Sequence, residues 1–209
     1  MLVGGSPTVT ARDPNIEADV RAIVSQIVDC LADGAPKPEP PVGAPPPVDA
    51  TKIPNSGITT IAIGGDHGGF ALKEKLAFRL REQGFSVEDC GTNSTEAVDY
   101  PDIAAAVAER VASQASQVGI IIDGAGIGSS MAANKIRGVR AALCYDVSTA
   151  RNAREHNHAN VLTLGAGLVG DSLAWQITQE FLATPYGEGR HARRVAKIDD
   201  LEKSSVEGS

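Results

Sequence analysis

The sequence has few cysteines, no excess of positive charge and no long hydrophobic run. Its three cysteines, Cys30, Cys90 and Cys144, are odd in number and lack CxxC spacing, so neither a disulfide framework nor a zinc site is expected. The formal net charge of -7 argues against a protein that binds nucleic acid or a membrane surface. No apolar run reaches the ~18 residues that span a bilayer, and the N-terminus has no basic segment followed by an apolar one. We therefore expect a cytosolic protein with no membrane and no nucleic-acid partner.

The prolines divide the chain into unlike parts. Ten of the twelve lie at or before Pro54, and eight of these fall between Pro36 and Pro54. Such a tract cannot build a core and favours the extended polyproline II conformation. The sequence therefore predicts an N-terminal segment at 1–34, a flexible linker at 35–57 and a domain at 58–209.

Upstream of the linker, the spacing of apolar residues predicts a short amphipathic helix. They recur every three or four residues between Ile16 and Leu31, with Pro14 suited to the first turn and Gly34 to the end. Such a helix is marginal alone in water, because its apolar face needs a partner. Two interpretations stay open: the helix packs on its own domain or on copies of itself, or the long spacer lets it bind elsewhere.

From Ile58 onward, short β-branched segments alternate with segments of helical spacing. The expected strands are 58–64, 85–90, 118–123, 139–144 and 160–165, and the expected helices are 70–84, 100–116, 129–135, 147–157 and 171–184. This series predicts an α/β fold with a doubly wound parallel sheet, in which ligands bind beyond the carboxyl ends of the strands. A strand order of 2-1-3-4-5 would place the loops after the first and third strands across one crevice.

Glycine-rich loops follow three of these strands, at 64–69, 123–128 and 165–167. Turns of this kind present several backbone N–H groups to one point, which favours a phosphate or an oxyanion. The simpler alternative is that the glycines only make tight turns. The second loop lacks the last glycine of the dinucleotide-binding pattern, and no P-loop lysine is present, so a nucleotide-binding module is the weaker interpretation.

Two histidines and two arginines add acid–base and anion-binding chemistry. His67 and His156 lie in the loop or helix-end contexts GGDHGG and REHNHAN, which favours acid–base work or phosphate contact. Arg190 and Arg194 are spaced i and i+4, so one helical face could hold an anion with two guanidinium groups, although a solvated basic face has the same spacing. Together they indicate a small phosphorylated ligand.

Five motifs resemble those of the type B ribose-5-phosphate isomerases and the related galactose-6-phosphate isomerase subunits. They are IAIGGDHGGFALKEKL, VDYPD, GIGSSMAANKIRGVRAALCYD, ARNAREHNHANVLTLGA and GEGRHARRV, and they run from Ile61 to about Leu201. The resemblance implies a Rossmann-like three-layer sandwich with a five-stranded parallel sheet, which forms homodimers or tetramers with shared active sites. It also implies aldose–ketose isomerisation of a sugar phosphate through a cis-enediol, with no metal and no organic cofactor.

The resemblance assigns a role to each matching residue. Asp123 would stand at the position of the proton-transfer base, and His156 would open the sugar ring. The substrate would be bound by Asp66, His67, Tyr100, Gly124, Ala125, Gly126, Gly128, Asn157, Arg190 and Arg194. Within this set, the loop glycines would supply N–H groups to the enediolate and the arginines would clamp the phosphate.

Three positions depart from the pattern that the resemblance implies. Asp123 stands where ribose-phosphate members carry a cysteine base, Ala125 where they carry threonine, and Gly167 where many carry a phosphate-binding arginine. One galactose-phosphate subunit type resembles this chain in having aspartate at the base position. An aspartate is ionised at neutral pH without activation, unlike a thiol, but it is the weaker base. Asp123 is therefore either the base of an isomerase or a helix cap in a member that only binds a sugar phosphate or pairs with an active homologue.

The N-terminal extension resembles, in pattern only, the encapsulation peptides of bacterial microcompartment cargo enzymes. In both, a short amphipathic helix is tethered by a linker rich in Pro, Gly and Ala. The resemblance implies a shell protein as the partner of residues 13–34 and a location inside a microcompartment. The polar face of the helix is acidic and mixed, which makes membrane-surface binding the weaker interpretation.

Overall fold

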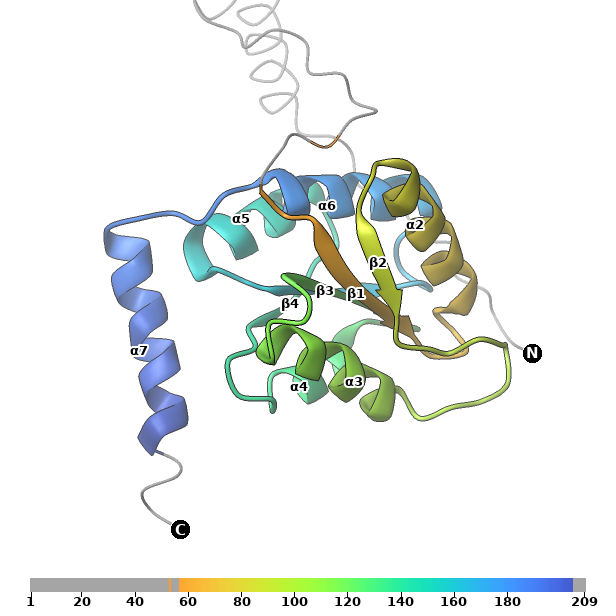
Figure 1. Cartoon of the computed structure of the whole chain (residues 1–209), viewed down its shortest axis with the longest axis horizontal. Helices are drawn as coiled ribbons and strands as arrows, with labels where there is room; N and C mark the ends of the chain where they lie inside the picture. The colour runs from red at the N-terminus through yellow and green to blue at the C-terminus, as the bar shows by residue number, and fades with distance from the viewer. Residues whose placement is uncertain (1–52, 54–56, 205–209) are drawn as a thin grey trace, which may run out of the picture. The chain divides into compact units, whose positions relative to one another are not determined.

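The computed structural model describes residue 53 and residues 57–204 (Figure 1). The strands are β1 (Thr60–Gly65), β2 (Ser86–Asp89), β3 (Val118–Asp123), β4 (Ala141–Leu143) and β5 (Val161–Gly165). The helices are α2 (Phe70–Glu82), α3 (Tyr100–Ala112), α4 (Ile127–Ala133), α5 (Val147–Asn157), α6 (Asp171–Ala183) and α7 (Arg190–Ser204). All the strands and helices predicted from residue 58 onward are confirmed. The predicted N-terminal helix lies outside the described residues.

The five strands form one parallel sheet in the order β2-β1-β3-β5-β4. The expected neighbours β1 and β3 are confirmed, but the expected order of the last two strands is wrong, because β5 lies beside β3 and β4 forms the edge. The burial of the two strands explains this order. All five residues of β5 are buried, as an inner strand of a parallel sheet requires, whereas the three residues of β4 are only half-buried.

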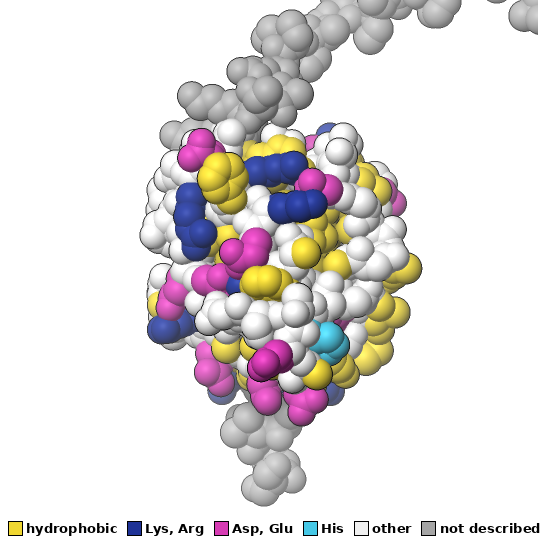
Figure 2. Space-filling view, turned by 90° about the vertical axis from the view of Figure 1, so that its right-hand side faces the viewer, with side chains coloured by type: hydrophobic (Ala, Val, Ile, Leu, Met, Phe, Trp, Pro, Cys, Tyr) yellow, Lys and Arg dark blue, Asp and Glu magenta, His cyan; other side chains and the backbone are white. Residues whose placement is uncertain are grey.

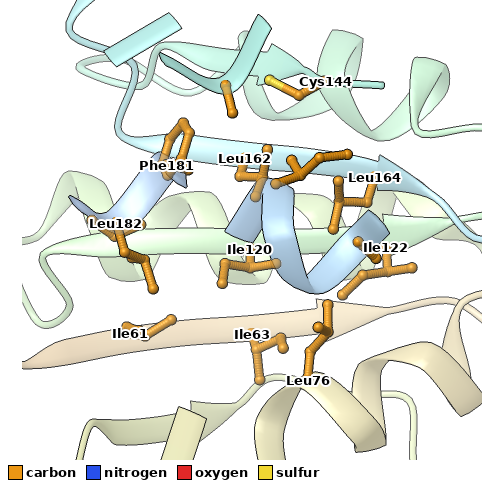
Figure 3. Packing of buried hydrophobic residues seen from close by; sticks show 14 of the residues in the cluster. Ile61, Ile63, Leu76, Ile120, Ile122, Cys144, Leu162, Leu164, Phe181 and Leu182 are labelled. Carbon is orange, nitrogen blue, oxygen red and sulfur yellow. The ribbon is translucent and has the colours of Figure 1, made fainter. Parts of the chain in front are cut away.

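Helices cover both faces of the sheet, so the domain has the predicted three layers (Figure 1). One face packs against α2, α5 and α6, and the other against α3 and α4. Figure 3 shows the first of these cores, where Ile61 and Ile63 of β1, Ile120 and Ile122 of β3, and Leu162 and Leu164 of β5 meet Leu76, Phe181 and Leu182. Burial of each such side chain contributes about 1.5–3 kcal/mol, which makes this sheet a rigid base for the loops at its ends.

One residue of the predicted linker 35–57 contacts the core. Ile53 is only 7% exposed and belongs to the core that includes α2 and α6. Its backbone N–H also donates a hydrogen bond to Gln83 Oε1 at 3.4 Å, just after α2. The boundary between linker and domain at 57/58 stays a prediction, and Ile53 packs on the domain from the linker side of it.

None of the helices in the described part of the chain is both long enough and apolar enough to cross a membrane.

Candidate functional site

The loops 64–69 and 123–128 lie side by side at the carboxyl end of the sheet. The backbone N–H of Asp66 donates to the carbonyl oxygen of Ile122 at 3.1 Å. A Cβ atom on Gly69 would lie 2.0 Å from the same oxygen, so only glycine allows this approach. The prediction that these two loops are neighbours is confirmed, and the crevice between them stays a prediction.

The loop 165–167 closes the other side of loop 123–128. The N–H of Ala166 donates to Asp123 O at 2.8 Å, and the N–H of Gly167 donates to Gly124 O at 3.0 Å. Gly167 therefore contributes a backbone contact between loops. The three glycine loops form one continuous surface.

The Asp123 carboxylate is turned into its own loop. This side chain is 5% exposed. Its Oδ1 accepts hydrogen bonds from the N–H groups of Ala125, at 2.8 Å, and Gly126. Its Oδ2 accepts from the N–H of Ser129 at 3.1 Å and from the Ser129 hydroxyl at 2.5 Å. The carboxylate thus ties the end of β3 to the first turn of α4.

These contacts bear on both interpretations of Asp123. The N-cap residue of α4 is Gly126, whose φ of 77° lies in the left-handed region that favours glycine. Asp123 is therefore not the N-cap residue that the second interpretation expected, although its carboxylate still accepts from the N–H of Ser129, the third residue of the helix. The N–H of Gly126, which the resemblance assigns to the enediolate, is used by Asp123. Sequence reasoning missed Ser129, although a serine in the first turn of a helix is a frequent partner for such a carboxylate.

Asp66 presents the second carboxylate of the loop surface. It is 8% exposed, and its Oδ1 accepts a hydrogen bond from the N–H of Gly69 at 2.9 Å. Within the described residues, its Oδ2 accepts no hydrogen bond. Asp66 therefore keeps one carboxylate oxygen for a ligand.

His67 and Tyr100 stand at the rim of the same surface. His67 is exposed, and its Nδ1 accepts a hydrogen bond from the N–H of Val98 at 3.4 Å. Tyr100 begins α3, and its ring lies against Gly128, where a Cβ atom would come within 2.6 Å of the ring. Figure 2 shows one face of the molecule, on which a histidine lies at the surface near acidic and hydrophobic side chains. Asp66, His67 and Tyr100 form the first group of predicted site residues, at the carboxyl end of the sheet.

A buried lysine, missed by sequence reasoning, supports this rim. Lys73 of α2 is fully buried, and its Nζ donates to Asp89 Oδ2 at 2.5 Å and to the carbonyl oxygen of Thr92 at 2.8 Å. It thereby holds the start of the loop that carries Val98. A signal was present, because Lys73 shares one helical stripe with the apolar residues Ala77 and Leu80.

The other predicted residues lie at the opposite end of the sheet. Helix α5 begins beyond the carboxyl end of β4 and runs back, so His156 and Asn157, near its end, lie beside the amino end of β5. The ring of His156 stacks on that of His191 in α7, with centroids 4.1 Å apart and planes 6° apart. Within one chain, these groups do not face the glycine loops.

Arg190 and Arg194 belong to this second group. Both are exposed on α7, one turn apart, and Arg190 Nε donates to His191 Nε2 at 3.3 Å. The pKa of His191 is lowered by desolvation and then by the positive charge of His156 and Arg190. Sequence reasoning missed His191, although it stands between the two arginines in GEGRHARRV.

The described residues contain no group of three or more His, Cys, Asp or Glu side chains that could hold a metal ion. The loop end of the sheet carries backbone N–H donors, the carboxylates of Asp66 and Asp123 and the imidazole of His67, and the other end carries His156 and the arginine pair.

A doubly wound parallel sheet with its glycine loops gathered at the carboxyl ends of the strands defines a Rossmann-like α/β protein. The chain belongs to the ribose/galactose isomerase family, which matches residues 61–198.

Relatives of known name agree with this family. The chain is 44% identical to ribose-5-phosphate isomerase B of Escherichia coli over 143 residues, which are 68% of this chain and 96% of that protein. It is also 44% identical to a putative sugar phosphate isomerase of Rickettsia typhi over 138 residues, 66% of this chain and 96% of the relative.

Solved structures give the same fold. Ribose-5-phosphate isomerase B of Clostridium thermocellum matches with a TM-score of 0.70 and 48% identity, over 70% of this chain and 99% of that one. The Mycoplasma genitalium enzyme, solved with bound ribulose-5-phosphate, matches with a TM-score of 0.68 and 43% identity, over 69% of this chain and 97% of that one.

Proposed function

We propose that the protein interconverts the aldose and ketose forms of a phosphorylated sugar, with ribose-5-phosphate and related pentose or hexose phosphates as candidate substrates. The observation that carries the proposal is the approach of Asp66 and Tyr100 to loop 123–128, with His67 next to Asp66 in the neighbouring loop. A carboxylate, a histidine and backbone N–H groups around one surface suit proton transfer next to a carbonyl group. Family membership and the ribulose-5-phosphate bound by a relative support a sugar phosphate as the ligand.

A second copy of the chain would complete the site. Each chain carries loops for the sugar at one end and an arginine pair for the phosphate at the other, so two copies could supply both to one substrate. Exposed apolar side chains support an interface between copies, among them Met131 of α4, 65% exposed, and Ile198 of α7, 42% exposed. The resulting homodimer would hold the phosphate with Arg190 and Arg194 of one copy while the loops of the other hold the sugar.

Subunit complementation tests this arrangement. Asp66→Asn and Arg194→Ala should each abolish turnover as purified proteins. When the two are unfolded and refolded together, a mixed dimer should contain one intact site, and about a quarter of the wild-type activity should return for random pairing at equal amounts. No recovery, although mass measurement shows mixed dimers, would exclude a shared site.

A second candidate function is sugar-phosphate binding without turnover, alone or beside an active homologue. The fully hydrogen-bonded carboxylate of Asp123, at the usual position of the family's base, favours it. A coupled isomerase assay across pentose, hexose, deoxy and 6-deoxy sugar phosphates separates the two functions. Turnover of one compound supports the isomerase, whereas ligand-induced stabilisation without turnover of any compound supports the binding protein.

For residues 13–34 we propose a role as an address that a shell protein of a microcompartment recognises. The proposal is supported by the amphipathic pattern and the proline-rich spacer that follows it. A fluorescent protein fused behind residues 1–57 should collect in microcompartments when shell proteins are co-expressed. Replacing Ile23 and Ile27 by Asp in the fusion removes the apolar face and should disperse the signal.

A further inference from the structure

The two carboxylates of the loop surface differ in what remains available to a ligand. A carboxylate offers about four lone-pair positions. All four of Asp123 are used, two by the N–H groups of Ala125 and Gly126 and two by Ser129. To take a proton from a substrate, Asp123 would have to lose one of these bonds.

Asp66 is differently placed. Its Oδ1 is oriented by the N–H of Gly69, and its Oδ2 has no partner among the described residues. Among the described residues, the fully buried side-chain atoms without a hydrogen bond do not include Asp66 Oδ2. This oxygen therefore keeps some contact with solvent. Orientation through one oxygen and access through the other are what a general base requires.

A hydrogen-bond donor stands across a small space from Asp66. The point where a Cβ atom on Gly68 would lie is 3.4 Å from Asp66 Oδ1 and 3.6 Å from the backbone nitrogen of Gly124. Within the described residues, the Gly124 N–H has no acceptor, and a Cβ atom on Gly124 would meet nothing within 4 Å. A substrate atom in this space would lie next to the Asp66 carboxylate, on the side of Oδ1, and near the Gly124 N–H group, so a small rotation of the carboxylate would bring Oδ2 to it.

From this geometry we propose that Asp66, and not Asp123, is the base that moves the proton between C2 and C1, and that Asp123 is a positioning residue that holds loop 123–129. The proposal rests on the isomerase function proposed above.

The proposed proton transfer balances without another reactant. Asp66 takes the proton from C2 of the open-chain aldose phosphate, and the C–H electron pair becomes the C1–C2 double bond. The π electrons of the C1 carbonyl move to O1, which accepts a hydrogen bond from the Gly124 N–H. The proton of O2 passes to O1, C2 becomes the carbonyl carbon, and Asp66 returns its proton to C1 to give the ketose.

Substitutions at the two carboxylates test the proposal in the full-length protein. Asp66→Asn keeps an oxygen for the Gly69 N–H but removes the base, so kcat should fall by about 10²-fold or more while ribose-5-phosphate still raises the melting temperature. Asp123→Asn should lower the melting temperature yet keep kcat within about tenfold of wild type at a temperature where it is folded. Proton exchange at C2 in D2O, followed by NMR, should be lost in Asp66→Asn and retained in Asp123→Asn.

A methyl probe gives a second test that does not depend on either carboxylate. Gly68→Ala places a methyl group in the space between Asp66 and Gly124 at ordinary contact distances, so the fold should be kept and KM should rise at least tenfold. Gly170→Ala, whose added methyl group would meet nothing within 4 Å, is the control for a glycine-to-alanine change away from the site and should leave activity unchanged.

The outcomes separate this inference from the function on which it rests. If the wild-type protein turns over a sugar phosphate and Asp66→Asn does so equally well, or if folded Asp123→Asn alone loses C2 exchange, the assignment of Asp66 is overturned and the isomerase function stands. If the wild-type protein binds sugar phosphates but neither converts any of them nor exchanges the proton at C2, the isomerase function and the role of Asp66 as its base are both wrong.

Discussion

Asp123 and Ser129 are joined twice, because one carboxylate oxygen, Oδ2, accepts both the backbone N–H of Ser129 at 3.1 Å and its hydroxyl at 2.5 Å. The pair ties the last residue of β3 to the first turn of α4 across the glycine loop. An aspartate at this position thus adds a strong local restraint.

The Ser129 hydroxyl should be a measurable part of this restraint. Ser129→Ala removes one hydrogen bond to a buried carboxylate, and such bonds to charged groups contribute about 1.5–3 kcal/mol. We expect a loss of this size in the free energy of unfolding in urea. Ser130→Ala is the control, because the Ser130 hydroxyl makes only a 3.5 Å contact with Ala141 O, and it should cost about 0.5 kcal/mol or less. Equal losses in the two variants would contradict the role of the pair.

Lys73 should stabilise the domain and the rim of the site together. Lys73→Met keeps most of the buried stem but leaves Asp89 and the Thr92 carbonyl without their donor. Removing one partner of a wholly buried ion pair costs ~3–5 kcal/mol, and we expect ~2–3 kcal/mol here because Asp89 is partly exposed. Urea unfolding measures this loss. Lys75→Met, which removes an exposed partner of Asp171, should change stability by less than about 0.5 kcal/mol.

The sequence predicted the parts of the fold that depend on local pattern. Alternating β-branched and helical segments gave all five strands and the helices between them, and the glycine loops indicated the carboxyl end of the sheet. The order of β4 and β5 was not predictable from their spacing, since it depends on which strand is buried on both faces. The burial of Ile53 was hidden because a single isoleucine among prolines carries no periodic signal.

The candidate site was predicted as a set of residue types but not as an arrangement in space. Asp66 and Tyr100 lie against loop 123–128, because parallel strands bring their loops to one end, and His67 adjoins Asp66 in the neighbouring loop. The separation of His156 to the other end follows from the direction of α5, which residue types do not reveal. The direction of the Asp123 side chain depends on hydrogen bonds from backbone N–H groups, which all residue types except proline carry, so the residue types around it give no signal.

The stack between His191 and His156 should make stability depend on pH. The pKa of His191 is lowered in the folded protein by desolvation and then by His156, Arg190 and Arg194, while Glu155 opposes the shift. The unfolded chain therefore binds more protons, so stability is full above the ordinary histidine value of about 6.5 and falls as the pH drops below it. We expect the melting temperature to fall between pH 7.5 and 5, and to fall less in His191→Phe, which keeps a stacked ring without a titrating group.

His67→Phe is the control for this prediction. It removes an exposed imidazole at the other end of the sheet and should leave the pH slope of the melting temperature as in wild type. If His191→Phe and the wild-type protein show the same slope, the stacked pair does not couple protonation to folding.

Two truncations should locate the true start of the domain. Removal of residues 1–52 leaves Ile53 in place, so the free energy of unfolding and any isomerase activity should match those of the full chain. Removal of residues 1–57 also deletes Ile53, whose buried side chain packs on the core and whose loss should cost about 2 kcal/mol. Ile53→Ala in the full-length protein should reproduce most of that cost, because it removes the same contacts without shortening the chain. If the protein without residues 1–52 is already unstable, these residues contribute to the fold and cannot act only as a tethered address. If both truncated proteins are as stable as the full chain, the contact of Ile53 with the core is dispensable.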